Sequence, residues 1–282
     1  MKLVNYLLRD GIHYGAVKNG KVVDLKTRFP YPDFVSFIAA RGERQAEKLL
    51  EDEDGDYDYD RLCLLPVVPN PGKILCIGLN YESHRIEGGH AKTEHPIVFA
   101  RWPESQTGHR TAIKRAVKVS TQLDFEAELL VVMARRTPRY TKRGDALKYV
   151  FGYSCYNEAC HRDWQAHTRT LTSGKNFEST GASGPWLVTA DEIPDPQALK
   201  FQMRLNGKVM QSDHTSQMIW PVNVVIEYIT CWLPLNPGDL IVMGTPGGVG
   251  FKRTPPVFMQ PGDIAEVEFE KIGTLTNRIE DE

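Results

Sequence analysis

The first hydrophobic residues of the chain form short runs that alternate with polar residues and are separated by turn signals. Asp10-Gly11 and Asn19-Gly20 divide residues 1–25 into three such runs. Both dipeptides tolerate the positive φ angles of a tight hairpin turn. Apolar residues then recur at helical spacing between about 32 and 51. The pattern therefore predicts three short strands joined by hairpins, followed by a helical region.

Most of the remaining pattern is typical of strands. Residues 64–73 contain three prolines and resemble a linker. Beyond them, alternating residues predict a hairpin over 199–211, and apolar residues at helical spacing predict a helix over 216–233. No regular alternation of strands and helices suggests a doubly wound sheet, so we expect an α+β, mainly β fold. The length suits a small N-terminal α+β domain with its linker, residues 1–68, and a larger catalytic domain, residues 69–282.

Composition and charge exclude several classes of protein. The net charge of -2 at pH 7 argues against a nucleic-acid partner. No apolar run approaches the roughly 18 residues of a membrane span. The apolar segment before Arg9 and Asp10 is shorter than we expect of a secretory signal. The acidic run at 51–60 lacks the glycine and glutamate spacing of a calcium loop, so we expect an exposed acidic loop. The five cysteines are scattered and form no C-x-x-C motif, which indicates reduced thiols and a cytoplasmic protein.

Candidate metal ligands occur in the segment 123–131, LDFEAELLV. On a strand, Asp124, Glu126 and Glu128 would share one face and the apolar residues the other. The two glutamates would lie about 6.5–7 Å apart along the strand and could bind one cation. Glu158 supplies a third acid. Three carboxylates without a thiolate or an imidazole pair favour Mg²⁺ or Mn²⁺, with Ca²⁺ possible, over Zn²⁺. The alternative is a solvated acidic strand face.

A candidate general base follows a predicted strand at residues 73–80. His84 and Glu87 lie three residues apart, and on a helical turn they share a face. A carboxylate can orient an imidazole and raise its basicity near neutral pH. Gly88 and Gly89 could act as the hinge of a lid. The alternative is an ordinary surface pair.

Taken together, these motifs resemble the fumarylacetoacetate hydrolase family, whose pattern runs E-x-E-L, Asn-Asp, R-D-x-Q and G-K-x-F, with an N-Y-x-x-H-x-x-E lid. The resemblance covers about residues 72–277. The family usually has Asp at position 158; the longer Glu158 could bind differently or miss the metal, and Asp124 is then a candidate substitute. In this chain the blocks read Glu126, Glu128, Leu129; Asn157, Glu158; Arg162, Asp163, Gln165; and Gly174, Lys175, Phe177.

The resemblance implies a mixed β-sandwich roll with a small N-terminal domain, and a homodimer. It implies that Lys175 reaches the metal-bound substrate and stabilises an enolate, while Arg162 and Gln165 position the substrate's oxygens. Thr245, in the glycine-rich segment 244–250, would face the substrate. Arg101, at the end of a predicted strand, could pair with an acidic substrate or be an exposed surface residue.

The implied activity is that of a metal-dependent hydrolase that cleaves a C–C bond in a 1,3-diketone or an acylpyruvate. His84, oriented by Glu87, would take a proton from water. The same residues could instead serve a decarboxylase of a β-keto acid such as oxaloacetate, or an isomerase of an unsaturated oxo-diacid in aromatic catabolism. A fourth possibility is a non-catalytic, metal-stabilised binder of small molecules.

Overall fold

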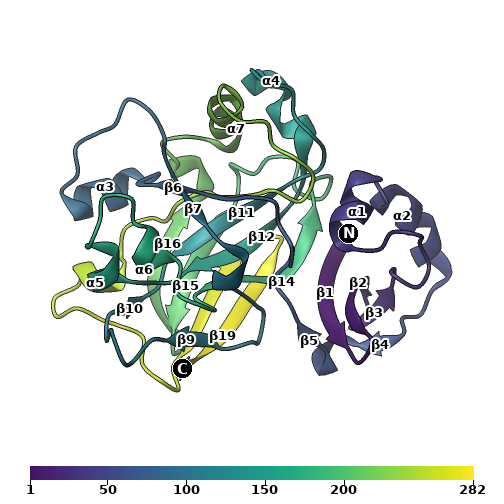
Figure 1. Cartoon of the computed structure of the whole chain (residues 1–282), viewed down its shortest axis with the longest axis horizontal. Helices are drawn as coiled ribbons and strands as arrows, with labels where there is room; N and C mark the ends of the chain where they lie inside the picture. The colour runs from purple at the N-terminus through teal and green to yellow at the C-terminus, as the bar shows by residue number, and fades with distance from the viewer.

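The computed structural model describes all 282 residues. In Figure 1 the N-terminal elements form a separate group beside a larger β-rich body. This group confirms the predicted hairpins, with β1 (Lys2–Leu8), β2 (Gly11–Lys18) and β3 (Lys21–Asp24) joined at the expected turns. The predicted helical region is divided into α1 (Phe34–Ala39) and α2 (Glu43–Asp52).

The N-terminal strands continue into the main sheet. The twelve-stranded sheet has the order β4-β3-β2-β1-β14-β12-β11-β17-β6-β7, with β5 paired to β1 and β8 paired to β14. Its remaining strands are β4 (Tyr57–Asp58), β5 (Cys63–Leu64), β6 (Ile74–Gly78), β7 (Ile97–Arg101), β8 (Gln106–Gly108), β11 (Ala127–Met133), β12 (Val150–Glu158), β14 (Gly181–Thr189) and β17 (Leu240–Val242).

A second sheet packs against the main one. It contains five strands in the order β16-β15-β18-β19-β9, and β15 and β16 form the hairpin predicted around Asn206 and Gly207. A short separate pair joins β10 to β13. The remaining strands are β9 (Ile113–Arg115), β10 (Leu123–Asp124), β13 (Cys160–His161), β15 (Lys200–Leu205), β16 (Lys208–His214), β18 (Ile264–Phe269) and β19 (Gly273–Asp281).

Buried side chains from both sheets form the main hydrophobic core. Leu129 and Val131 of β11 meet Phe201 and Val267 of the second sheet, with Phe201 stacked on Phe269. The alternate residues of β11 point to the opposite face. There Leu130 packs in a second core with residues of the N-terminal helices. The mixed sheets and the two-layer packing confirm the predicted mainly β, α+β fold.

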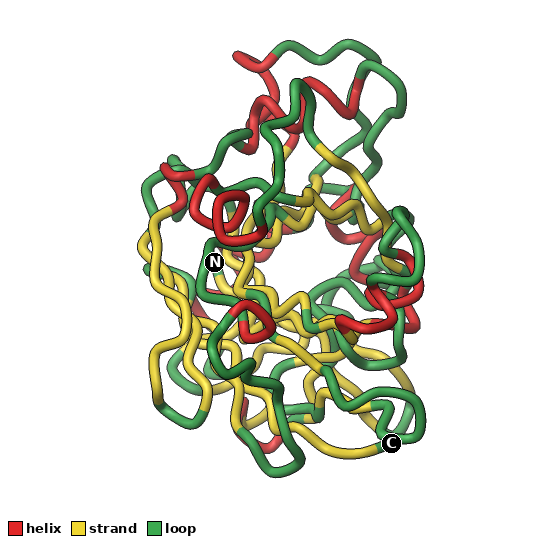
Figure 2. Tube along the Cα trace, turned by 90° about the vertical axis from the view of Figure 1, so that its left-hand side faces the viewer, coloured by secondary structure: helices red, strands yellow, loops and turns green.

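The two predicted domains share one β-sheet and one hydrophobic core. Leu3 of β1 pairs with Leu187 of β14, and one core contains both Phe37 of α1 and Phe151 of β12. Figures 1 and 2 place the two termini well apart, on different parts of this assembly. A division into residues 1–68 and 69–282 stays a prediction.

The remaining helices are short. The helix predicted over 216–233 is shorter in the structure, α7 (Val222–Thr230), because Pro221 is its N-cap. The long polar loop expected after Asp163 contains two helical turns, α5 (Arg162–Gln165) and α6 (Thr172–Lys175). No helix combines the length and apolarity that a membrane span requires. The other helices are α3 (Glu82–Gly88) and α4 (Arg143–Ala146).

Candidate metal centre and active site

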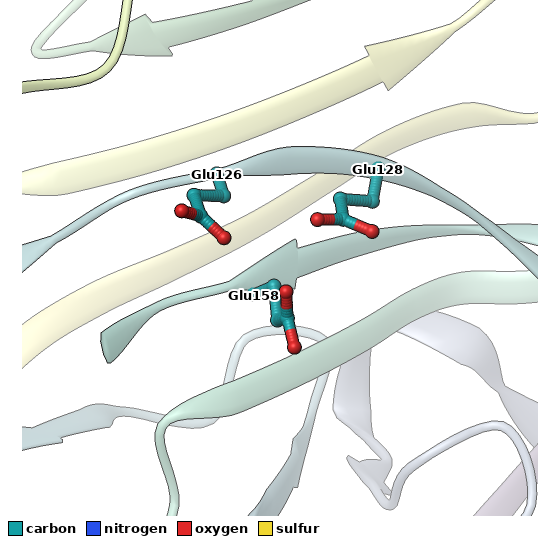
Figure 3. Close-up of side chains that lie close together, drawn as sticks. All are labelled: Glu126, Glu128 and Glu158. Carbon is teal, nitrogen blue, oxygen red and sulfur yellow. The ribbon is translucent and has the colours of Figure 1, made fainter. Parts of the chain in front are cut away.

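Three glutamates meet where β11 and β12 pair. Glu126 lies just before β11, Glu128 is in that strand, and Glu158 is the last residue of β12. The backbone N–H of Glu158 donates to the carbonyl of Glu126 at 2.9 Å. One carboxylate oxygen from each glutamate lies within 4.8 Å of the other two (Figure 3). The structure therefore brings together the three acids that the sequence suggested as ligands.

All three carboxylates are buried, and their electrostatics differ. Burial and the nearby Glu158 and Glu126 raise the pKa of Glu128 well above its ordinary value. Burial also raises the pKa of Glu126, but Arg162 and Lys175 outweigh it and lower that pKa below its usual range. Arg162 Nη2 lies 2.6 Å from Glu126 Oε1. Crowded buried acids of this kind require positive charge nearby.

Lys175 supplies part of that positive charge. Its Nζ donates to Glu126 Oε2 at 2.5 Å and to Glu158 Oε2 at 3.0 Å. The other oxygen of Glu158, Oε1, is buried without a hydrogen-bond partner. A buried, unpaired carboxylate oxygen next to two further carboxylates fits a bound cation.

The donor set favours a hard divalent ion. Gly244 donates its backbone N–H to Glu128 Oε2, which fixes that side chain. The nearby thiols are poor competitors because burial raises the pKa of Cys160 to about 12 and that of Cys76 well above its ordinary value. Carboxylate oxygens without a thiolate suit Mg²⁺, Mn²⁺ or Ca²⁺.

Asp124 does not join this cluster, although the strand pattern placed it on the same face. The chain leaves the β geometry between β10 and β11, so the predicted single strand is interrupted. The Asp124 carboxylate accepts backbone N–H groups of Gly250 at 2.8 Å and Phe251 at 3.0 Å. It also accepts Arg162 Nε at 2.8 Å. These contacts make Asp124 the group that holds Arg162 in place, and it is not a substitute metal ligand.

Arg101 lies behind Glu158 and outside the cavity. Its guanidinium is buried and donates to Thr180 Oγ1 at 2.6 Å and to the carbonyl of Ala159 at 3.2 Å. Its Nη1 lies 3.9 Å from Glu158 Oε1. The sequence left two alternatives for Arg101, a contact with an acidic substrate and an exposed surface position. The structure supports neither, because Arg101 is buried and does not line the cavity. Instead, Arg101 supports the end of β12.

The predicted lid residues lie on α3. Glu87 Oε1 accepts the backbone N–H of Gly248 at 3.0 Å, and Ser83 Oγ accepts that of Gly247 at 3.0 Å. Burial alone would raise the pKa of Glu87, but the contacts with His84 and the Gly248 N–H outweigh burial and lower that pKa below its usual range. His84 Nδ1 lies 3.5 Å from Glu87 Oε2, a distance at the limit of a hydrogen bond. The helix therefore rests on the glycine-rich loop with its imidazole close to a carboxylate.

One cavity of about 270 Å³ connects the lid and the carboxylates. Gln165 accepts a hydrogen bond from Arg162 Nη1 at 2.9 Å. Arg162 also lies over the ring of Phe251, which the sequence did not suggest as a site residue. Of the residues named from the sequence, those that line the cavity are His84, Gly88, Glu126, Glu128, Glu158, Arg162, Gln165, Lys175 and Thr245.

Gln211, on β16 of the second sheet, is a site residue that sequence reasoning missed. Its Nε2 donates to Thr245 Oγ1 and to the Pro246 carbonyl, both at 2.9 Å. Its Oε1 accepts the N–H of Ala127, between Glu126 and Glu128, at 2.9 Å. Its position in the predicted hairpin gave no signal of this role, because the contacts come from segments far away in the sequence.

Comparison with known proteins identifies the family. The sequence model for the C-terminal domain of fumarylacetoacetate hydrolase matches residues 73–280. The chain belongs to the fumarylacetoacetate hydrolase family. This confirms the resemblance suggested by the sequence motifs.

Members of the family with different activities resemble this chain. Oxaloacetate tautomerase YisK of Bacillus subtilis is 39% identical over 249 residues, covering 86% of this chain and 82% of that protein. A fumarylacetoacetate hydrolase of Exiguobacterium antarcticum is 29% identical, with a TM-score of 0.83 and full coverage of both chains. A 2-hydroxyhepta-2,4-diene-1,7-dioate isomerase of Mycobacterium marinum is 25% identical, with a TM-score of 0.76, covering 100% of this chain and 99% of that one. Fumarylacetoacetate hydrolase family membership therefore leaves the reaction type open.

Proposed function

We propose that this protein is a metal-dependent tautomerase that interconverts the enol and keto forms of a 2-oxo dicarboxylic acid, with oxaloacetate as the first candidate. The observation that carries the proposal is that His84 and the three glutamates line one cavity. Such an arrangement suits proton transfer next to a stabilised enolate. The 39% identity to an oxaloacetate tautomerase over most of both chains supports this choice of substrate.

Glu126, Glu128 and Glu158 would hold the cation, Mg²⁺ or Mn²⁺. When bound, it supplies a Lewis acid that stabilises negative charge on the substrate's oxygen. Lys175 adds a second positive charge to the same cavity. The charged fork of Arg162 suits a substrate carboxylate, and Asp124 fixes the orientation of that fork.

His84 would transfer the proton. In the direction from enol to keto, one proton leaves the enol oxygen and one arrives at the neighbouring carbon, so the overall composition is unchanged. A neutral imidazole can accept the first proton and deliver it to the carbon. Glu87 would orient the ring, since its Oε2 lies 3.5 Å from His84 Nδ1 and its Oε1 is held by the Gly248 N–H.

C–C bond hydrolysis of an acylpyruvate is the second candidate. The observation that favours it is the His84–Glu87 pair, because an imidazole oriented by a carboxylate can equally take a proton from water. The resulting hydroxide would attack the distal carbonyl, and cleavage of the C–C bond would release a carboxylic acid and leave the enolate of pyruvate next to Lys175. Hydrolysis therefore consumes water and breaks a C–C bond, whereas tautomerisation only moves a proton between the substrate's oxygen and carbon.

Proton NMR in D₂O separates these reactions. The Mn²⁺- or Mg²⁺-loaded enzyme should speed deuterium incorporation at C3 of oxaloacetate and the decay of the enol, and a chelator should abolish both effects. Pyruvate release would indicate decarboxylation instead, and cleavage of acylpyruvates without accelerated enol decay would favour the hydrolase. No metal-dependent change with any of these substrates would contradict an enzymatic role and favour a non-catalytic binder. Assembly as a homodimer and a cytoplasmic location are part of the same proposal.

A further inference from the structure

The basic side chains of the cavity differ in whether they form ion pairs. Arg162 and Lys175 form ion pairs with Glu126, so the carboxylates partly neutralise them. Arg169 and His90 also line the cavity, but their side chains take part in no ion pair or hydrogen bond in this structure. The cavity therefore combines an acidic end for a metal with two basic groups that have no partner.

Arg169 is carried by a short segment fixed to the site at both ends. The segment 166–171 joins α5, which ends at Gln165, to α6, which contains Lys175. Leu171 adopts φ +63°, a left-handed conformation that bulky residues rarely take, and it also lines the cavity. Strained backbone of this kind concentrates at binding sites. The segment is exposed, and Arg169 and Leu171 both line the cavity.

The surroundings of Arg169 favour an anion. Ile97, Phe99 and Phe251 supply apolar surface to the same cavity, which suits the carbon chain of a ligand whose charged end reaches the exposed Arg169. A guanidinium binds a carboxylate through two parallel hydrogen bonds, with more geometric specificity than an ammonium. His90 follows the lid helix and lines the same cavity, and its backbone carbonyl accepts a hydrogen bond from Arg85.

We propose that Arg169 forms a second-carboxylate subsite that selects 2-oxo diacids over 2-oxo monoacids. The inference rests on the proposed function for the placement of the substrate's 2-oxo acid end at the three glutamates and Arg162. A chain of four or five carbons anchored there extends toward the remaining cationic group of the cavity, and its distal carboxylate pairs with Arg169. A monoacid of equal length offers a methyl group to the guanidinium and gains nothing from it.

The test compares two ligands that differ only in the distal carboxylate. Calorimetric titration of the Mn²⁺-loaded full chain would use 2-oxoglutarate and 2-oxopentanoate, which have the same five-carbon length. Wild type should bind the diacid at least tenfold more tightly, and Arg169→Gln should bring the two affinities within about threefold by weakening the diacid alone. Arg169→Lys should retain part of the preference because it keeps the charge but not the fork.

Arg136→Gln is the matched control, because it removes an exposed arginine outside the cavity and should leave the preference intact. Equal affinity of wild type for both ligands, or an unchanged preference in Arg169→Gln, would overturn the subsite. Turnover separates this outcome from failure of the proposed reaction. If wild type binds diacids through Arg169 but leaves the enol of oxaloacetate unchanged, the reaction is wrong and the subsite stands. If tautomerisation proceeds with the same KM for oxaloacetate in Arg169→Gln, the subsite is wrong and the reaction stands.

Discussion

Gln211 and Thr245 are joined by a buried hydrogen bond, in which Gln211 Nε2 donates to Thr245 Oγ1 at 2.9 Å. The same carboxamide accepts the N–H of Ala127 on the strand that carries Glu128. One side chain from the second sheet thus connects the glycine-rich loop to the metal-binding strand. Because that loop also supports the lid through Gly248 and Glu87, Gln211 fixes the relative position of ligands and lid.

Replacing Gln211 with Leu should therefore affect both stability and the site. The substitution leaves the Ala127 N–H and the Pro246 carbonyl buried without partners, and each unpaired group costs about 1–3 kcal/mol. We expect urea unfolding to show a loss of at least about 2 kcal/mol. We also expect weaker Mn²⁺ binding, because the strand between Glu126 and Glu128 loses an anchor. Gln202→Leu, on the neighbouring strand and partly exposed, is the control. Equal losses in the two variants would contradict the connecting role of Gln211.

Glu158→Gln tests the third metal ligand. The change keeps the size of the side chain and removes one charge from a cluster that already contains Lys175 and Arg162. We expect Mn²⁺ affinity to fall at least tenfold by calorimetry, equivalent to about 1.4 kcal/mol. Glu94→Gln, an exposed glutamate away from the cluster, should leave the affinity unchanged. Wild-type affinity in Glu158→Gln would remove this residue from the ligand set.

The sequence predicted the parts of the site that are local in the chain. His84 and Glu87 occupy one helical turn, and Glu126 and Glu128 bracket one residue, so their spacing indicated proximity before any fold was known. The match of several ordered motifs extended this to Glu158 and Lys175. Hairpin turns at Asn19-Gly20 and Asn206-Gly207 were predictable for the same reason, because the turn chemistry lies within two residues.

Contacts between distant segments were not predictable in this way. Asp124 shares the alternation of the glutamates, but the break before β11 turns its carboxylate toward Gly250 and Arg162. Arg101 ends its strand as expected, but the packing of Thr180 and Ala159 around it removes it from the cavity. In both cases the side chain's partners come from segments that only the tertiary fold brings near, so local pattern carried no information about them.

His109 should make the fold sensitive to mild acid. Burial, and to a lesser extent Arg110, lower the pKa of His109 to about 4, and its Nδ1 accepts the N–H of Thr276 at 3.0 Å. The unfolded chain binds a proton at this position below about pH 6.5, while the folded protein does not until about pH 4. The contribution of neutral His109 to the free energy of unfolding is therefore fully present above pH 6.5 and is lost as the pH falls toward 4.

His109→Asn tests this dependence, since its Oδ1 can accept the same N–H without binding a proton. The variant's stability should decline less than that of wild type between pH 6.5 and 4, with a difference on the order of 3 kcal/mol across the range. Urea unfolding at half-unit pH steps measures it. Parallel stability curves for the two proteins would show that His109 is not responsible for acid sensitivity.

Substitutions of His84 and Glu87 should distinguish effects on proton transfer from effects on metal binding. His84 is the imidazole in the cavity that lies next to a carboxylate, and His84→Ala removes it. The rate of oxaloacetate tautomerisation should therefore fall about 10²–10⁴-fold. The Mn²⁺ affinity should stay at the wild-type value, because the three glutamates are unchanged. Glu87→Gln should have a smaller effect, because its Oε1 can still accept the Gly248 N–H and hold α3 in place while the charge that orients His84 is lost. Enol decay and calorimetry on the same samples give both quantities.

If Glu87→Gln lost as much activity as His84→Ala, the carboxylate would itself be transferring protons. If His84→Ala also lost the metal, the imidazole would belong to the binding site instead of the proton-transfer step.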